Sequence, residues 1–290
     1  MGEEPGRGSM RLEPMLPQHM ARHAERTGVS KAGKPGLSLL ILGGLAGAFI
    51  AFGATFATLV VAAGGDLPQG PLLLLGGVAF SLAYVLAILG GAELFTTNNL
   101  MVMAWASGKL SLPGLLRAWG LVFVGNAIGA AVTGALLVGA GIHQRASDAV
   151  GRGLLERAAE ILALTPVEGF LLGVLGNALL CLGVWLTYSG TTATDRVLAL
   201  LPPVAAFYAL GLEHAIAVLF YLPVAVAIRC AGGAADAEPV AVTLASLFGS
   251  LLPVTVGNII GGGLLVALVY WFVYLRGDRW AGGNEDDNGE

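Results

Sequence analysis

Charged residues are scarce in this chain. Asp, Glu, Lys and Arg make up 12% of its 290 residues, whereas 56% are hydrophobic and the mean hydropathy is +0.79. A soluble domain carries roughly 25% charged residues, so this balance excludes an ordinary soluble protein and predicts an integral membrane protein. The net charge is −4 and no basic patch occurs outside the terminal segments, so we expect no nucleic-acid partner.

Cysteine and histidine are also scarce. The two cysteines, Cys181 and Cys230, lie in and just beyond apolar stretches, so we expect no disulfide framework. No Cys-x-x-Cys pair or His/Cys cluster predicts a metal site, and we expect no cofactor. The chain lacks His-Glu-x-x-His and Gly-x-Ser-x-Gly motifs, which argues against a membrane-embedded enzyme. Residues 1–36 are polar, with no apolar core before Leu37, and predict no secretory signal peptide.

Long charge-poor stretches predict six transmembrane spans. They cover residues 37–63, 72–106, 118–142, 169–194, 197–228 and 240–275. A span needs about 20 apolar residues, so each stretch can cross once. The second and fifth are too long for one plain helix and carry Glu93 and Glu213 near their middles. Because a central carboxylate is costly in lipid, we interpret both as interrupted helices. The alternative is one tilted helix with a tolerated glutamate in each.

The basic residues predict the orientation. With six spans and a cytoplasmic N-terminus, 11 of the 15 Lys and Arg residues fall on the cytoplasmic side, which favours both termini inside. We therefore divide the chain into a cytoplasmic tail (1–36), a membrane domain (37–276) and an acidic cytoplasmic tail (277–290). The N-terminal tail is interpreted as a disordered anchor at the anionic leaflet.

The two halves of the membrane domain resemble each other. Gly91-Ala92-Glu93 is echoed by Gly211-Leu212-Glu213, and Val124-Gly125-Asn126-Ala127-Ile128-Gly129 by Val256-Gly257-Asn258-Ile259-Ile260-Gly261. Three spans per half force opposite orientations, which predicts an inverted repeat whose broken helices meet near the membrane mid-plane. Half-helix N-termini attract anions there.

His214 is the only histidine in any membrane-length stretch, and such a residue is a functional-site candidate by default. Its neighbour Glu213 would point about 100° away on a regular helix, so the two share a pore face only if the backbone unwinds. The sequence leaves open whether burial or the nearby carboxylate decides the charge of the imidazole.

Other polar and aromatic residues have two interpretations each. Asn126 and Asn258 are expected to bond the backbone groups that a broken helix leaves free, because an amide in lipid needs partners. Thr96 either bonds its own helix or lines a slit. Phe80 and Phe207 either constrict a pore or face lipid or core.

Four stretches of the chain resemble the formate–nitrite transporter family. They are Gly91-Ala92-Glu93-Leu94-Phe95-Thr96, the stretch from Gly176 to Trp185, Glu213-His214, and the stretch from Thr255 to Gly263. The resemblance covers roughly residues 37–276. It implies a homopentamer of six-span, aquaporin-like protomers in a bacterial or archaeal plasma (inner) membrane. Each protomer would pass small monovalent anions such as formate, nitrite or hydrosulfide.

The resemblance also implies roles for individual residues. His214 matches the central pore histidine and Thr96 the threonine that faces it. The constrictions match Leu94 and Phe207, with Phe80 beside the outer one, and the supporting polar positions match Asn177 and Glu213.

Three departures from the family's pattern stand out. Many members carry a lysine before the fourth span, thought to draw anions inward, and residues 159–166 have none. Val218 replaces a common asparagine, and Thr97 a common serine. These differences bear on which anion is carried and on its pH dependence.

The free-energy costs of moving an anion and of protonating it predict a mechanism. Moving a bare anion through a dry constriction costs many kcal/mol, whereas protonating an acid whose pKa lies three units below ambient pH costs roughly 4 kcal/mol. We therefore expect the anion to gain a proton or a strong hydrogen bond at Thr96 and His214. The main alternative is an aquaporin-like channel for small neutral solutes, but the chain has no paired Asn-Pro-Ala motifs.

Overall fold

The computed structural model describes residues 15–234 and 241–277, and within them every regular element is helical. In the first half the α-helices are α1 (Pro17–Ala32), α2 (Gly36–Ala62), α3 (Gln69–Leu89), α4 (Val102–Ala106) and α5 (Leu112–Gly139). In the second half they are α6 (Ala149–Ala163), α7 (Pro166–Thr187), α8 (Ala193–Ala209), α9 (Ala215–Cys230), α10 (Leu244–Asn258) and α11 (Val269–Tyr274). Short 3₁₀ segments η1 (Thr97–Met101) and η2 (Ile142–Gln144) precede α4 and α6, and the π-helical segment η3 (Ile259–Leu268) joins α10 to α11.

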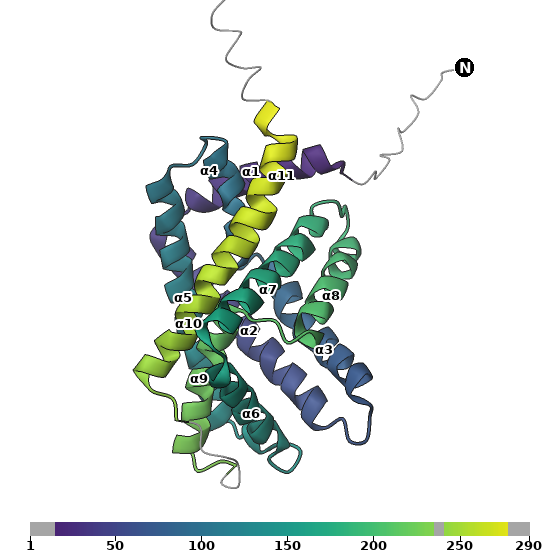
Figure 1. Cartoon of the computed structure of the whole chain (residues 1–290), viewed down its shortest axis with the longest axis vertical. Coiled ribbons are helices and arrows are strands. Elements are labelled where there is room, and N and C mark those ends of the chain that lie inside the picture. The colour runs from purple at the N-terminus through teal and green to yellow at the C-terminus, as the bar shows by residue number, and fades with distance from the viewer. Residues whose placement is uncertain (1–14, 235–240, 278–290) are drawn as a thin grey trace, which may run out of the picture.

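Five helices of the described chain are long and apolar enough to cross a membrane. They are α2, α3, α5, α7 and the continuous 31-residue run from Leu244 to Tyr274. α9 is apolar but has only 16 residues. Figure 1 shows these helices side by side in one tilted bundle, with α1 lying across the end from which the C-terminal helix emerges. The fold is therefore that of an all-helical membrane protein.

Two glycines end helices at matching places. α3 stops at Leu89 and the chain turns at Gly91, whose φ is +73°. α8 stops at Ala209 and the chain turns at Gly211, whose φ is +64°. Only glycine adopts this left-handed conformation without steric cost. Glu93 and Glu213, which follow these glycines, therefore lie in short non-helical segments.

Small residues bring pairs of long helices into close contact. A Cβ on Gly129 of α5 would overlap the carbonyl oxygen of Gly44 in α2. In the second half, a Cβ on Gly261 would overlap the carbonyl oxygen of Val174 in α7. Close backbone approach through glycine is the usual way to pack helices in lipid, so these contacts fix the frame around both helix ends.

The expectation of a disordered N-terminal tail is wrong for residues 17–32. They form α1, and Met20, Ala24 and Gly28 bury one face of it. These residues recur at the spacing of a helix face, and that face packs against the bundle. A Cβ added to Gly28 would lie only 3.2 Å from atoms of Met101 and Ala104. The outer parts of the two predicted tails, 1–14 and 278–290, lie outside the described residues.

Candidate functional site

The two non-helical segments meet at a buried cluster of three side chains. The Nε2 atom of His214 lies 2.7 Å from Oγ1 of Thr96 and 3.0 Å from the hydroxyl of Tyr84. All three residues are fully buried. Thr96 directly precedes η1, Tyr84 lies on α3, and His214 directly precedes α9. The structure thus brings together the histidine and threonine singled out from the sequence, and it adds a tyrosine that sequence reasoning missed.

His214 also caps helix α9. Its Nδ1 accepts a hydrogen bond of 3.2 Å from the backbone N–H of Ala217, and its own backbone is extended at φ −139° and ψ 121°. A ring nitrogen that accepts carries no proton, so the neutral ring has its hydrogen on Nε2. The cap therefore turns His214 into a fixed N–H donor aimed at Thr96 and Tyr84.

Asn126 and Asn258 support the two segments with matching hydrogen bonds. Asn126 donates to the carbonyls of Gly43 and Glu93 and accepts from the N–H of Phe95. In the other half, three bonds of the same kind are made by Asn258, to Gly173, Glu213 and Ala215. By this correspondence Leu94, which is 1% exposed, occupies in the first segment the place of His214 in the second.

Asn177 connects the two halves. Its Nδ2 donates to the carbonyls of Thr96, at 3.1 Å, and Asn258, at 2.7 Å. The thiol of Cys181 donates to the same Thr96 carbonyl at 3.4 Å. Asn177 thus holds the backbone of Thr96 and leaves the threonine hydroxyl to face His214.

The two glutamates form ion pairs at opposite ends of the bundle. At the end covered by α1, the Glu93 carboxylate lies 2.9 Å from Nζ of Lys31 and 2.6 Å from Nζ of Lys34. At the other end, Glu213 accepts a bond of 2.7 Å from Nη2 of Arg157 on α6. Both glutamates are 1% exposed. A buried carboxylate needs such a partner, and this requirement is the signal that could have found the three basic residues in the sequence.

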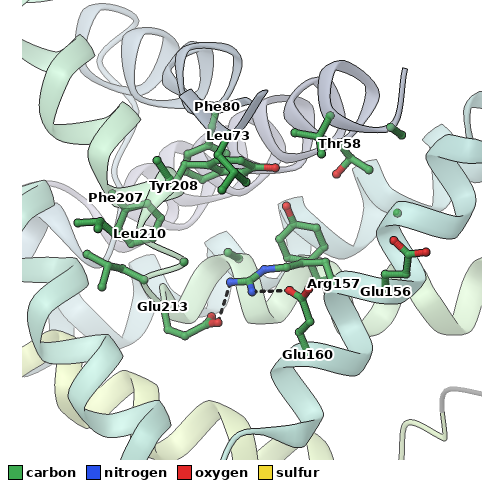
Figure 2. Close-up of a pocket in the computed structure, with 18 of the residues that line it drawn as sticks. Thr58, Leu73, Phe80, Glu156, Arg157, Glu160, Phe207, Tyr208, Leu210 and Glu213 are labelled. Carbon is green, nitrogen blue, oxygen red and sulfur yellow. Dashed lines mark hydrogen bonds and ion pairs between the residues drawn. The ribbon is translucent and has the colours of Figure 1, made fainter. Parts of the chain in front are cut away.

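A cavity of about 690 Å³ opens at the α6 end of the bundle. Figure 2 shows Arg157 at its centre, between Glu213 and Glu160, with Phe80 and Phe207 on the opposite wall. The two phenylalanine rings stack with their centroids 6.0 Å apart, and the Phe207 ring also meets the His214 ring edge-on at 6.2 Å. The aromatic pair therefore lies between the cavity and the histidine.

Arg157 supplies a permanent positive charge to this cavity. Burial alone would lower the pKa of its guanidinium, but the carboxylate of Glu213, together with that of Glu160, outweighs this effect and raises it. The Arg157 side chain is therefore cationic at any physiological pH.

Among residues 15–234 and 241–277, no group of three or more His, Cys, Asp or Glu side chains is arranged to hold a metal ion.

Comparison with known proteins gives one consistent result. The family "Formate/nitrite transporter" matches residues 18–272. "Formate channel FocA" of Escherichia coli (strain K12) is 38% identical over 271 residues, which cover 90% of this chain and 95% of that protein. "Formate channel FocB" of the same organism is 34% identical, over 93% of this chain and 99% of that protein.

Solved structures agree with the sequence matches. A "Pentameric formate channel with formate bound" superposes with a TM-score of 0.75 at 34% identity, covering 83% of this chain and 98% of that one. An "FNT family ion channel" superposes with a TM-score of 0.74 at 26% identity, covering 89% of this chain and 98% of that one.

Proposed function

Because this chain belongs to the formate/nitrite transporter family, whose matched relatives are formate channels and not enzymes, we propose that it passes small monovalent anions, formate first among them, across a bacterial or archaeal inner membrane. The observation that carries this proposal is the fixed Nε2–H donor of His214, which faces Thr96 beside the aromatic wall of a cavity that contains Arg157. Nitrite and hydrosulfide share the charge and small size of formate and are the other candidate substrates.

The proposed architecture has six membrane crossings in two inverted halves. Segments α3 and η1–α4 form the second crossing, and α8 and α9 form the fifth, each interrupted where the chain turns. The matching hydrogen bonds of Asn126 and Asn258 support the relation between the halves. Both termini are placed in the cytoplasm by the distribution of basic residues, so the Arg157 cavity faces outward. The pentameric formate channel supports a homopentamer with one pore per protomer.

The proposed path runs from the cavity to the histidine. An anion entering from outside meets the charge of Arg157, passes Phe80 and Phe207, and reaches the donors at Thr96 and His214. Leu94 and the aromatic pair keep the passage apolar, so a bare anion faces a large desolvation cost there. Glu213 and Asn177 hold the donors in place, and the carboxylate of Glu93 plays the matching part at the inner end.

The geometry of His214 favours hydrogen bonding to the anion over proton transfer. A second proton would have to go on Nδ1, where it would break the bond from the Ala217 N–H and place a positive charge at the positive end of α9. We therefore propose that the imidazole stays neutral and donates from Nε2. A proton that travels with the anion would come from water in the cavity.

The proposal is tested by flux into proteoliposomes. Formate, nitrite and hydrosulfide are added separately in a stopped-flow instrument, with and without an imposed pH gradient. Uptake of formate that exceeds that of protein-free vesicles is expected, and acceleration by a proton gradient would show that protons accompany the anion. Failure of all three anions to enter would overturn the proposed function, and uptake of glycerol instead would indicate a neutral-solute channel.

A further inference from the structure

Arg157 holds two carboxylates that differ greatly in exposure. Its Nη2 bonds Glu213, whose side chain is 2% exposed, and its Nη1 bonds Oε2 of Glu160 at 2.9 Å, whose side chain is 65% exposed. Figure 2 shows both bonds in the cavity, on two sides of one guanidinium. The arginine therefore has one buried partner and one partner that reaches it from the solvent side.

The backbone of Glu213 is held by two hydrogen bonds, and its buried carboxylate is held by the ion pair with Arg157. Its backbone N–H donates to the carbonyl of Leu172 and its own carbonyl accepts from Asn258. Breaking a buried ion pair leaves an uncompensated charge and is strongly unfavourable. This pair therefore anchors Arg157 and keeps Nη1 directed into the cavity.

The Glu160 carboxylate is held much less firmly. It lies three residues after Arg157 on α6, on the exposed surface of that helix. Exposed ion pairs of this spacing are weak because water screens them and both side chains lose freedom. A free carboxylate at a suitable concentration can take its place at Nη1.

We propose that Glu160 is a tethered competitor of the transported carboxylate, and that a small carboxylate such as formate displaces it from Nη1 of Arg157 on entering the cavity. This inference rests on the proposed function. A guanidinium N–H binds any carboxylate with the same geometry, so Glu160 occupies the receiving site with the chemical group that the substrate carries. Tethering gives Glu160 a high effective concentration, which raises the formate concentration needed for half-saturation.

Glu156 provides a matched control. It lines the same cavity from the same helix but has no bond to Arg157 in Figure 2. The variants E160Q and E156Q each remove one negative charge from the cavity, and only E160Q removes the carboxylate that Nη1 binds. Any effect of overall charge is common to both, so the difference between them measures the competition.

The test measures formate uptake against concentration in right-side-out and inside-out vesicles. For E160Q we expect the half-saturating formate concentration to fall about two- to fivefold, as for loss of a weak exposed pair, with little change in the maximal rate. The shift is expected only in right-side-out vesicles, where the cavity meets the added formate, and E156Q should show a smaller one. Equal shifts in the two variants, or none in E160Q, would overturn the proposal.

A binding measurement separates this proposal from the proposed function. The full chain in nanodiscs is titrated with ¹³C-formate and followed by NMR line broadening. Tighter binding to E160Q than to E156Q supports the competition even if no variant transports formate, in which case only the proposed function fails. Equal binding by the two variants, or no binding by either, overturns the competition directly.

Discussion

At the scale of single residues, His214 combines two tasks through its two ring nitrogens. Nδ1 closes the first turn of α9, and Nε2 faces Thr96 and Tyr84. The first task fixes the ring for the second, because the cap decides which nitrogen carries the hydrogen. The imidazole is thus a directional donor. Its position stands out in the sequence because it is the single histidine in an apolar stretch.

The hydroxyl of Thr96 should matter more than its shape. Thr96→Val removes the oxygen that lies 2.7 Å from Nε2 of His214 while keeping the volume of the side chain. We expect formate flux to fall about tenfold or more, because a hydrogen bond to a charged group contributes about 1.5–3 kcal/mol. Thr96→Ser restores the hydroxyl and should retain most of the flux. Stopped-flow uptake by equal amounts of reconstituted protein measures both, and equal rates for Val and Ser would contradict this role.

Asn258 should carry much of the local stability. Asn258→Leu leaves the carbonyl of Glu213 and the N–H of Ala215 without their partner and removes the second donor to the helical carbonyl of Gly173. Each unsatisfied buried group costs about 1–3 kcal/mol, so the free energy of unfolding should fall by several kcal/mol. Denaturation in detergent measures this loss. Asn126→Leu is the matching variant in the other half and should behave alike, whereas a wild-type midpoint for both would refute the scaffolding role.

Residue-level prediction from sequence reached some of this site but not all. An isolated histidine and paired asparagines stand out by composition and repetition. Tyr84 and Arg157 do not, because one lies in an ordinary apolar helix and the other in a polar segment whose distance from Glu213 depends on the fold. The roles of Thr96, Asn177 and the constriction residues in conduction stay predictions.

At the scale of elements, the contact between α2 and α5 depends on glycine. Gly129→Ala would place a methyl group against the carbonyl of Gly44, and we expect a loss of about 1–3 kcal/mol in stability, as for overpacking. Gly120→Ala on the same helix is the control, because its Cβ would meet no atom within 4 Å. Thermal unfolding in detergent compares them, and equal midpoints would contradict close packing at Gly129.

Helix α1 should dock less firmly in acid. Burial beside Tyr188, reinforced by the charges of Arg26 and Arg196, lowers the pKa of His23 below its usual 6.5. The undocked helix therefore binds a proton more readily, so docking loses free energy as pH falls below about 6.5 and is unaffected well above it. Hydrogen exchange of α1 at pH 7.5 and pH 5.5, corrected for intrinsic rates, should show less protection in acid.

His23→Gln supplies the control for that experiment. Glutamine does not titrate, so this variant should lose most of the difference between the two pH values. An unchanged difference would assign the acid effect to a group other than His23.

Element-level prediction succeeded where periodicity and composition were strong. Long apolar stretches predicted the membrane helices. α3 and α8 end just before the glycines that precede the two glutamates, and the interruption of two membrane crossings at these places stays a prediction. α1 and α6 were not predicted. Their sequences are short and polar and have no recognisable cap, and each helix buries one face only by packing on the bundle. Those two helices supply Lys31 and Arg157, two of the three cations that offset the buried glutamates.

At the scale of the whole molecule, the proposal requires a closed ring of protomers. Many large apolar side chains lie on the outer faces of the described helices, for example Leu116 and Leu136 on α5 and Leu171 on α7. Lipid and neighbouring protomers would cover them. Native mass spectrometry in mild detergent should show a pentamer, in line with the superposed formate channel. A monomer or dimer that still transports formate would contradict a pentameric functional unit.

Formate uptake by a His214→Asn variant tests the central claim most directly. Asparagine is a good helix cap, so α9 should remain folded, but its shorter amide does not reach Thr96 and Tyr84 as the imidazole does. We predict that wild-type protein takes up formate in proteoliposomes and that the variant, equally folded by circular dichroism, does so at least about tenfold more slowly. A variant that carries formate at the wild-type rate with the same pH dependence would show that the histidine is not the donor on the path.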